Sequence, residues 1–394
     1  MKSLEIFSGA GGLAKGLELA GFQHAAFVEF NKYACESLAE NFDRNKVFFG
    51  DIKEFNFDNL GSVDVVAGGP PCQPFSLGGK HKADQDKRDM FPYAISAIEK
   101  LTPKAFVFEN VKGLLRDSFS EYFEYILLRL TFPKVSAELN LDWQDHLETL
   151  RSIKSIAYAG IKYDVSYKLI NSADYGIPQT RERVVIVGIR SDLSVNWKFP
   201  PRTHSEDRLL WEKYITNQYW DRYNTHKSEI NITSDLLREN IYKLQDRYGM
   251  FEPELLPWNT IRDALHGVPE PQSRHGIIDH IFRDGARTYP GHTGSVIDWP
   301  SKTIKAGGHG VPGGENMIRY PDGSVRYLTV YEAKLIQTFP NEFVIKGPWG
   351  EAMRQIGNAV PVKLGEIIGL ELFKQLNSQK VNSQKLRSNV KCAV

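Results

Sequence analysis

Cysteine is scarce in this chain: Cys35, Cys72 and Cys392 are widely spaced and odd in number among 394 residues. Such a pattern is typical of a reducing compartment and argues against a disulfide framework. Long apolar runs are also missing, since no stretch approaches the ~20 residues needed to cross a bilayer. Near the N-terminus, Glu5 stands where a secretory signal would need an apolar core. These absences predict a cytoplasmic protein with no membrane partner.

The chain also has no large excess of positive or negative charge: it contains 49 Lys and Arg residues and 48 Asp and Glu residues, which gives a formal net charge of +1. The overall charge therefore does not indicate nucleic-acid binding, and such a function must rest on local features. The composition, 41% hydrophobic and 25% charged, is ordinary for a globular protein. The length predicts one large domain and a second, smaller one.

Short apolar runs alternate with amphipathic stretches through the first half of the chain, which is the rhythm of a βαβ sheet. After the first run, Leu13, Leu17 and Ala20 recur at helical spacing until Gly21. The predicted fold is α/β, with a Rossmann-like, doubly wound, mostly parallel sheet. Strands are expected at 4–7, 25–28, 47–49, 63–67, 105–108, 163–169 and 184–189.

The pattern of apolar and charged residues changes beyond Arg190. Residues 200–300 combine many charges with five aromatic residues between Trp211 and Tyr223, and they show no sustained alternation. We predict an irregular, loop-rich small domain there, followed by an amphipathic closing helix that includes Leu364 and Leu372. The expected organisation is a large domain (1–190), the small domain (191–325), a return to the large domain (326–375) and a disordered basic tail (376–394).

Chemically distinctive residues follow the predicted strands, whose carboxyl ends form the ligand-binding edge of an open parallel sheet. Gly9, Gly11 and Gly12 allow a sharp turn and a close ligand approach. Glu29, about 20 residues further on, is placed to accept the hydroxyls of a ribose. Asp51 ends the third strand, where it could accept from an adenine amino group. Taken singly, each carboxylate is as well explained by a helix N-cap or a solvated loop.

The glycine loop also lacks something: no Lys-Ser or Lys-Thr pair follows it. A cradle for nucleotide triphosphates is therefore not supported. Together, the loop and the two carboxylates predict a pocket for an adenosine-bearing cofactor without phosphates.

Cys72 lies in a loop, 68–76, that three prolines stiffen and keep out of helix and strand interiors. Rigid loops at a sheet edge often carry reactive groups, so Cys72 is a candidate nucleophile. Cys35 and Cys392 are instead interpreted as small hydrophobic residues. The basic, glycine-hinged stretch that follows, 78–88, suits a loop that closes over a polyanion, although a solvated charged loop is the alternative.

Glu109 closes the fifth predicted strand, and Arg181 and Arg183 stand at alternating positions before the last one. One guanidinium could face the site while the other braces an acidic neighbour. A surface salt bridge is the alternative for these arginines.

With these residues in place, the sequence resembles the cytosine-5 DNA methyltransferase family of the bacterial restriction-modification type. The motifs occur in the family's order and span roughly residues 4–190 and 320–373. They are Phe-Ser-Gly-Ala-Gly-Gly (7–12), Glu29, Asp51, Pro-Pro-Cys-Gln (70–73), Glu-Asn-Val (109–111), Gln-Thr-Arg-Glu-Arg (179–183), Arg-Tyr-Leu-Thr (326–329) and Gln-Ile-Gly-Asn-Ala-Val-Pro (355–361).

The resemblance implies that Cys72 adds to C6 of cytosine, that Glu109 hydrogen-bonds at N3, and that Arg183, supported by Arg181, holds the O2 edge. S-adenosylmethionine would be the methyl donor, and no metal is expected. The implied cofactor contacts are Phe7, Gly9, Ala10, Gly11, Gly12, Leu13, Glu29, Asp51, Ile52, Pro70, Met90, Asn358 and Val360.

The implied partner is double-stranded DNA, from which the target cytosine must be flipped out of the stack. The small domain (191–325) would then be the target-recognition domain, with side chains within about 200–300 reading base edges. A monomer that protects bacterial host DNA is expected. One departure is the segment 132–156, longer than compact members need, which is predicted to be an added amphipathic helix on the far side of the sheet without an assignable role.

Three alternatives remain open at this point. A tRNA cytosine-5 methyltransferase shares Pro-Pro-Cys-Gln but carries a Cys-Phe-Thr signature, and no cysteine lies between Cys72 and Cys392. A nucleotide-binding oxidoreductase would leave Cys72, Glu109 and the two arginines unexplained. A catalytically inactive DNA-binding regulator would need neither Cys72 nor Glu109.

Overall fold

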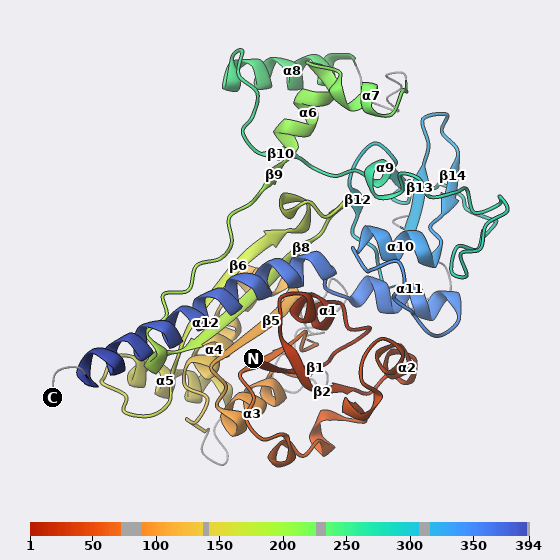
Figure 1. Ribbon diagram of the computed structural model, residues 1–394. Helices are drawn as coiled ribbons and strands as arrows, with labels where there is room; N and C mark the ends of the chain where they lie inside the picture. Colours follow the sequence, from red (N-terminus) through yellow and green to blue (C-terminus); the bar gives the residue numbers. More distant parts are fainter. Residues whose placement is uncertain (72–88, 137–141, 226–233, 307–315, 392–394) are drawn as a thin grey trace. The chain divides into compact units, whose positions relative to one another are not determined.

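The computed structural model describes residues 1–71, 89–136, 142–225, 234–306 and 316–391. The chain divides by its contacts into two compact units (Figure 1). The first comprises residues 1–170, 182–200 and 365–394, and the second comprises 171–181 and 201–364. The first unit therefore depends on segments that are far apart in the sequence.

A seven-stranded sheet forms the centre of the first unit, in the order β3-β2-β1-β4-β5-β8-β6. The strands from β3 to β5 pair in parallel, and β8 is antiparallel to β5. The predicted mostly parallel α/β sheet is thus confirmed. The strands are β1 (Lys2–Ile6), β2 (Gln23–Glu29), β3 (Val47–Phe49), β4 (Val65–Gly68), β5 (Ala105–Val111), β6 (Tyr163–Asn171) and β8 (Glu182–Arg190).

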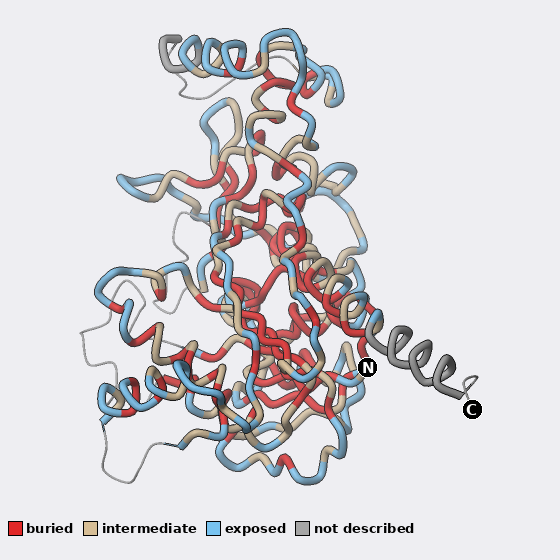
Figure 2. Tube along the Cα trace, turned by 90° about the vertical axis from the view of Figure 1, so that its left-hand side faces the viewer, coloured by how far each residue is buried: buried red, intermediate tan, exposed pale blue. Residues whose placement is uncertain are grey.

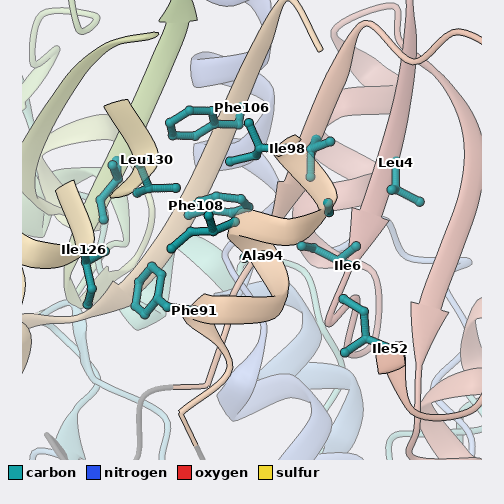
Figure 3. Close-up of a cluster of buried hydrophobic side chains, with 14 of the residues drawn as sticks. Leu4, Ile6, Ile52, Phe91, Ala94, Ile98, Phe106, Phe108, Ile126 and Leu130 are labelled. Carbon is teal, nitrogen blue, oxygen red and sulfur yellow. The ribbon is translucent and has the colours of Figure 1, made fainter. Parts of the chain in front are cut away.

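Helices cover both faces of this sheet. Leu4 and Ile6 of β1 belong to one large apolar core together with residues of α3 (Phe91–Leu101) and α4 (Ser120–Thr131), several of which Figure 3 labels. Because side chains alternate along a strand, Glu5 and its neighbour Phe27 face the other side. Phe27 packs there against α1 (Gly12–Leu19) and α2 (Lys32–Asn41). The central strands β1, β4, β5 and β8 are consequently mostly buried, whereas the edge strands β3 and β6 are partly exposed. Figure 2 shows how burial varies along the whole chain.

The predicted closing helix is present as α12 (Val362–Lys391). Its Gly365 and Gly369 allow close packing on α1, since a Cβ at either position would lie within 3.3 Å of Leu13 or Leu17. The helix continues to Lys391, where the sequence analysis expected a disordered tail from 376. No proline or glycine follows Gly369, so the chain contains no strong helix breaker there.

The predicted added helix is α5 (Trp143–Lys154). Its Leu147 and Leu150 pack against Leu128 and Phe132 at the end of α4. The inserted segment 132–156 is therefore joined to the helical layer of the first unit through α4.

The second unit contains more helix than the loop-rich domain that was predicted. Its helices are α6 (Glu206–Tyr214), α7 (Gln218–Arg222), α8 (Ser234–Tyr248), α9 (Ile261–Ala264), α10 (Val330–Ile336) and α11 (Trp349–Asn358). The clustered aromatics explain the difference, because Leu209, Tyr219 and Trp220 form a small core on which Trp258 and Trp299 pack. The Ser205 side chain also caps the start of α6.

Short strands complete the second unit. They are β11 (Ser295–Val296), β13 (Met317–Arg319) and β14 (Val325–Tyr327) in one sheet, β9 (His204–Ser205) with β10 (Leu256–Pro257), and β7 (Gln179–Thr180) with β12 (Ser301–Lys302). The sequence analysis places the return to the large domain at residue 326, whereas the contacts begin it at Gly365. The reason is that β14 pairs with β13, which keeps this segment in the second unit.

Charged side chains are buried inside the second unit. Lys213 is fully buried, with its Nζ 4.0 Å from the ring centroid of Trp299. Asp298 accepts from Nε of Arg262 at 2.6 Å and from the Tyr219 hydroxyl at 2.9 Å. None of the helices in the described ranges is both long and apolar enough to cross a membrane.

Candidate active site

The glycine loop connects the end of β1 to α1 through backbone conformations with positive φ at Phe7 (52°), Gly9 (54°) and Gly11 (86°). At Gly11 glycine is also required by space, because a Cβ would lie 2.8 Å from the Phe42 ring. At Gly9 the same position has no atom within 4 Å. The loop therefore turns sharply and leaves the side of Gly9 open.

Glu29 lies directly against this loop. Its Oε2 accepts from the N–H of Gly9 at 2.8 Å, and its Oε1 accepts from the N–H groups of Phe30 (3.0 Å) and Asn31 (2.8 Å). A carboxylate has about four acceptor positions, so these main-chain donors occupy most of them and fix the side chain. The structure thus brings together the glycine loop and the carboxylate that the sequence analysis paired.

Asp51 follows β3, next to Glu29 on the sheet edge, where the N–H of Gly50 donates to the Glu29 carbonyl oxygen at 3.0 Å. Its Oδ1 accepts from the N–H of Lys53 at 3.0 Å and caps a short 3₁₀ turn. The N-cap that was considered as an alternative is therefore real, and the side chain remains 45% exposed. Ile52 is buried in the core of the first unit.

The other predicted cofactor contacts in the first unit differ in exposure. Phe7 and Met90 are partly buried against the large core, while Ala10 and Leu13 are buried. Burial limits what the side chains of Ala10 and Leu13 can offer to a ligand. Pro70 is buried as well and accepts a hydrogen bond through its main-chain oxygen.

Two exposed aromatic residues at this edge were missed by the sequence analysis. Phe30 follows Glu29 directly and is 73% exposed, and Phe49 precedes Gly50-Asp51 and is 61% exposed. A single exposed apolar side chain is ordinary on a protein surface, so it is the place of these two rings beside Glu29 and Asp51 that makes them candidates. The available signal was their position, since each adjoins an acidic strand end.

Cys72 and the segment 72–88 lie outside the described residues, but both ends of that segment are described. The Asn110 side chain donates to the Pro70 carbonyl oxygen at 3.0 Å, and the N–H of Met90 donates to that of Pro71 at 3.0 Å. At Gly68, a Cβ would lie 2.0 Å from the Ile6 carbonyl oxygen. This close approach explains the glycine at the end of β4.

Glu109 and Arg183 form an ion pair in which Nε and Oε1 are 2.9 Å apart. The two side chains are only 11% and 15% exposed, which excludes the surface salt bridge considered for Arg183. A Cβ at Gly69 would lie 3.7 Å from Oε2 of Glu109, so this carboxylate adjoins the chain that leads to Cys72.

Arg181 is directed elsewhere. It is fully buried in the second unit, and its Nη1 donates to the Gly357 carbonyl oxygen at 3.0 Å. Gly357 immediately precedes Asn358, the exposed last residue of α11, while Val360 is buried. The described contact of Arg181 is therefore with the chain before a predicted cofactor residue.

Further buried polar contacts belong to the same motifs. The Gln179 amide donates to the Gln337 side chain at 3.1 Å, and Gln337 donates to the Ile356 carbonyl oxygen at 2.7 Å. Arg326 makes two contacts of 2.6 and 2.7 Å with Glu332. Because buried polar groups need partners, we interpret these residues as structural.

The order and direction of the strands are those of the Rossmann-like fold of S-adenosylmethionine-dependent methyltransferases. A family model described as C-5 cytosine-specific DNA methylase matches residues 1–132 and 140–374. The chain belongs to that family, as the sequence analysis predicted. Neither the tRNA-acting enzyme nor the oxidoreductase is favoured by this match.

Named relatives agree with this assignment. The type II methyltransferase M.PspPI of Psychrobacter is 30% identical, over 95% of this chain and 79% of its own length. M.Sau96I of Staphylococcus aureus is 32% identical, over 95% and 76%. The crystal structure of the S. pombe Dnmt2 methyltransferase is similar with a TM-score of 0.55 and 16% identity, over 95% of this chain and 98% of that one, which shows the shared fold.

Proposed function

We propose that the protein methylates C5 of a cytosine in double-stranded DNA, with Cys72 as nucleophile and S-adenosylmethionine as methyl donor. The observation that carries this proposal is the ion pair of Glu109 and Arg183 beside Gly69. The Glu109 carboxylate and the Arg183 guanidinium are largely buried, and Glu109 lies close to Gly69, which precedes Pro70, Pro71 and Cys72. Such a pair is suited to hydrogen-bond a polar ring that lies next to a thiol.

The reaction needs a nucleophile because C5 of cytosine is itself a poor one. The Cys72 thiolate would form a bond to C6, which moves an electron pair toward C5 and N3 and makes C5 able to take the methyl group. When bound, S-adenosylmethionine supplies a methyl group activated by its sulfonium. Loss of the C5 proton and departure of the thiolate then restore the aromatic ring.

Glu109 would hydrogen-bond at N3 and offset the negative charge that develops on the ring, an effect worth roughly 10²–10⁴-fold. The Arg183 guanidinium has five N–H donors in a rigid fork. One of them can remain on Glu109 while another holds O2 of the ring. Arg181 would act indirectly, through its contact with Gly357.

The residues at the sheet edge fit an adenosine group. Oε2 of Glu29 accepts one main-chain hydrogen bond and retains capacity for a ribose hydroxyl. The open side of Gly9 permits close approach, and the exposed ring of Phe30 offers a surface for stacking on adenine. Asp51, with its half-exposed carboxylate, suits the adenine amino group. We also propose Asn358 and Val360 as cofactor contacts.

DNA binding and biological role extend this proposal. Cys72 cannot reach C6 while the base is stacked, so the target must be flipped out at a cost of a few kcal/mol. We propose residues 191–325 as the target-recognition domain that offsets this cost. The names of the type II relatives support a role in restriction-modification. We propose in addition that the protein acts in the bacterial cytoplasm and as a monomer.

The nucleophile can be tested with a matched pair of cysteine variants. Burial raises the pKa of Cys35 to about 12, so its thiol is almost entirely protonated at neutral pH. Cys72→Ala should abolish transfer of labelled methyl groups to DNA while S-adenosylmethionine still binds. Cys35→Ala should retain the activity of the parent protein. Appreciable turnover by Cys72→Ala would refute the assignment.

A further inference from the structure

Asp89, the first described residue after the segment 72–88, is a buried acid. Asp89 is 9% exposed, and its carboxylate accepts from the N–H of Phe91 at 3.1 Å and from the hydroxyl of Tyr122. A buried carboxylate is costly unless it is hydrogen-bonded, and such charge-assisted bonds are among the stronger ones. Asp89 is thereby tied to the first turn of α3 and to the side of α4.

The next residue connects this anchor to the nucleophile. Met90 donates its N–H to the carbonyl oxygen of Pro71, and that carbonyl belongs to the peptide bond joining Pro71 to Cys72. Because a peptide unit is planar, a bond to this oxygen constrains the orientation of the whole unit. A displacement of Asp89 would therefore shift Met90, and with it the hydrogen bond to the peptide unit that precedes Cys72.

The ring of Tyr122 packs against Trp143 of α5. Tyr122 is 6% exposed, and its ring meets that of Trp143 edge to face, with centroids 5.2 Å apart and planes at 89°. Trp143 also packs against Tyr125, at 5.7 Å. This edge-to-face geometry is a favourable arrangement for aromatic pairs, and it places the first residue of α5 against the residue that binds Asp89.

Helix α5 is fastened to α4 along its length. Beyond the apolar contacts of Leu147 and Leu150, Arg151 donates to both carboxylate oxygens of Glu124, at 2.6 and 3.2 Å. The hydrogen bond from Arg151 lowers the pKa of Glu124. These contacts hold α5 against α4 and so fix the position of Trp143 at the start of α5. The amphipathic pattern of α5 alone does not indicate this role.

We propose that Tyr122, braced by Trp143 of the inserted helix, is a positioning residue for methyl transfer, acting through Asp89 and Met90 on the peptide bond before Cys72. The inference rests on the proposed function of Cys72. It assigns to the insertion a part in the reaction, in place of packing alone.

Packing alone is the competing explanation, and Tyr125 provides the matched control. Tyr125 lies one turn further along α4 and touches the same Trp143, but its hydroxyl bonds to Nδ1 of His146 at 3.1 Å. Tyr122→Phe and Tyr125→Phe each remove one hydroxyl from the interface around α5. Only Tyr122→Phe removes a hydrogen bond to Asp89.

The experiment measures covalent trapping on random-sequence duplex DNA that contains 5-fluorocytosine, with S-adenosylmethionine present. The rate constant for adduct formation should fall about tenfold in Tyr122→Phe, since small misplacements of reacting groups are costly, and it should stay within about twofold in Tyr125→Phe. The dissociation constant for S-adenosylmethionine should change less than the trapping rate in both variants.

Trp143→Leu removes the ring that packs on Tyr122 and leaves the hydroxyl of Tyr122 in place. It therefore tests the positioning role independently of Tyr122→Phe, in case that variant does not fold. Trp143→Leu should slow trapping, while Tyr125→Phe, at a similar melting temperature, should not. Equal trapping rates in Tyr122→Phe and the parent, or equal losses in Tyr122→Phe and Tyr125→Phe, would overturn the positioning role alone. Absence of any adduct with the parent protein would overturn the proposed function and this inference with it.

Discussion

Among the described residues, the second unit buries more charged side chains than the first, although Glu5 and Asp89 are buried in the first unit as well. The core of the first unit is aliphatic and aromatic, and residues such as Glu29 and Glu109 stand at the strand ends. In the second unit, Lys213 and Asp298 lie inside, among tryptophan and tyrosine rings. We interpret the acidic residues at the sheet edge of the first unit as available for chemistry, and the buried ion pairs of the second unit as structural. The same residue types therefore serve different purposes in the two units.

The sharpest test of this difference is Glu109→Gln. The amide has nearly the same shape and its oxygen can still lie beside Nε of Arg183, but it can neither release a proton nor place a negative charge at N3. We expect the single-turnover rate of methyl transfer to fall by roughly 10²–10⁴-fold, while the melting temperature changes little. A large loss of stability without a loss of rate would place Glu109 among the structural charges.

Asp298→Leu is the corresponding change in the second unit. It removes the partner of Arg262 and an acceptor of Tyr219, and uncompensated buried charges of this kind cost about 3–5 kcal/mol. Urea unfolding should show this loss. The double variant Arg262→Met with Asp298→Leu should recover much of it, because both charges are then gone. If the double variant is no more stable than the single one, the pair does not act as a buried ion pair.

Two buried histidines, one in each unit, should give the smallest effect. Burial lowers the pKa of His146 in the first unit and of His204 in the second. In the unfolded chain both titrate near 6.5, so the unfolded state binds more protons below that pH. Their contribution is complete above about pH 6.5 and is lost as the pH falls toward the folded pKa values.

Melting curves between pH 7.5 and pH 5 would measure this contribution. His204→Gln should flatten the decline in melting temperature with falling pH, and His146→Gln should do the same. A histidine variant that steepens the decline would contradict a lowered pKa of that histidine in the folded protein.

Much of the first unit could be predicted because its pattern is local. Most strands of the sheet contain a short apolar run, and an acidic residue at or near the carboxyl end of the strand marks the sheet edge, as at Glu29 and Glu109. The main-chain donors that fix Glu29 could not be foreseen, because they depend on how the glycine loop folds back. Nor could the exposure of Phe30, since an aromatic residue beside a strand is normally assigned to the core.

The second unit resisted prediction for a physical reason. Its short helices α6 and α7 mix charged, aromatic and aliphatic residues without a regular spacing, so their sequences show no clear apolar face. Lys213 would be placed on the surface by any local rule, yet it packs over Trp299. The side chain of Arg181 reaches Gly357, 176 positions away, and a partner at such a distance leaves no local trace.

The close fit of α12 on α1 has a consequence during synthesis. Gly365 and Gly369 pack on Leu13 and Leu17, so one of the first helices to leave the ribosome gains its cover from a helix made after more than 340 further residues. Until then the apolar side of α1 has no native partner in α12. During this time the apolar side of α1 is open to aggregation. A chaperone that binds apolar helices could bind α1 until α12 has been synthesised.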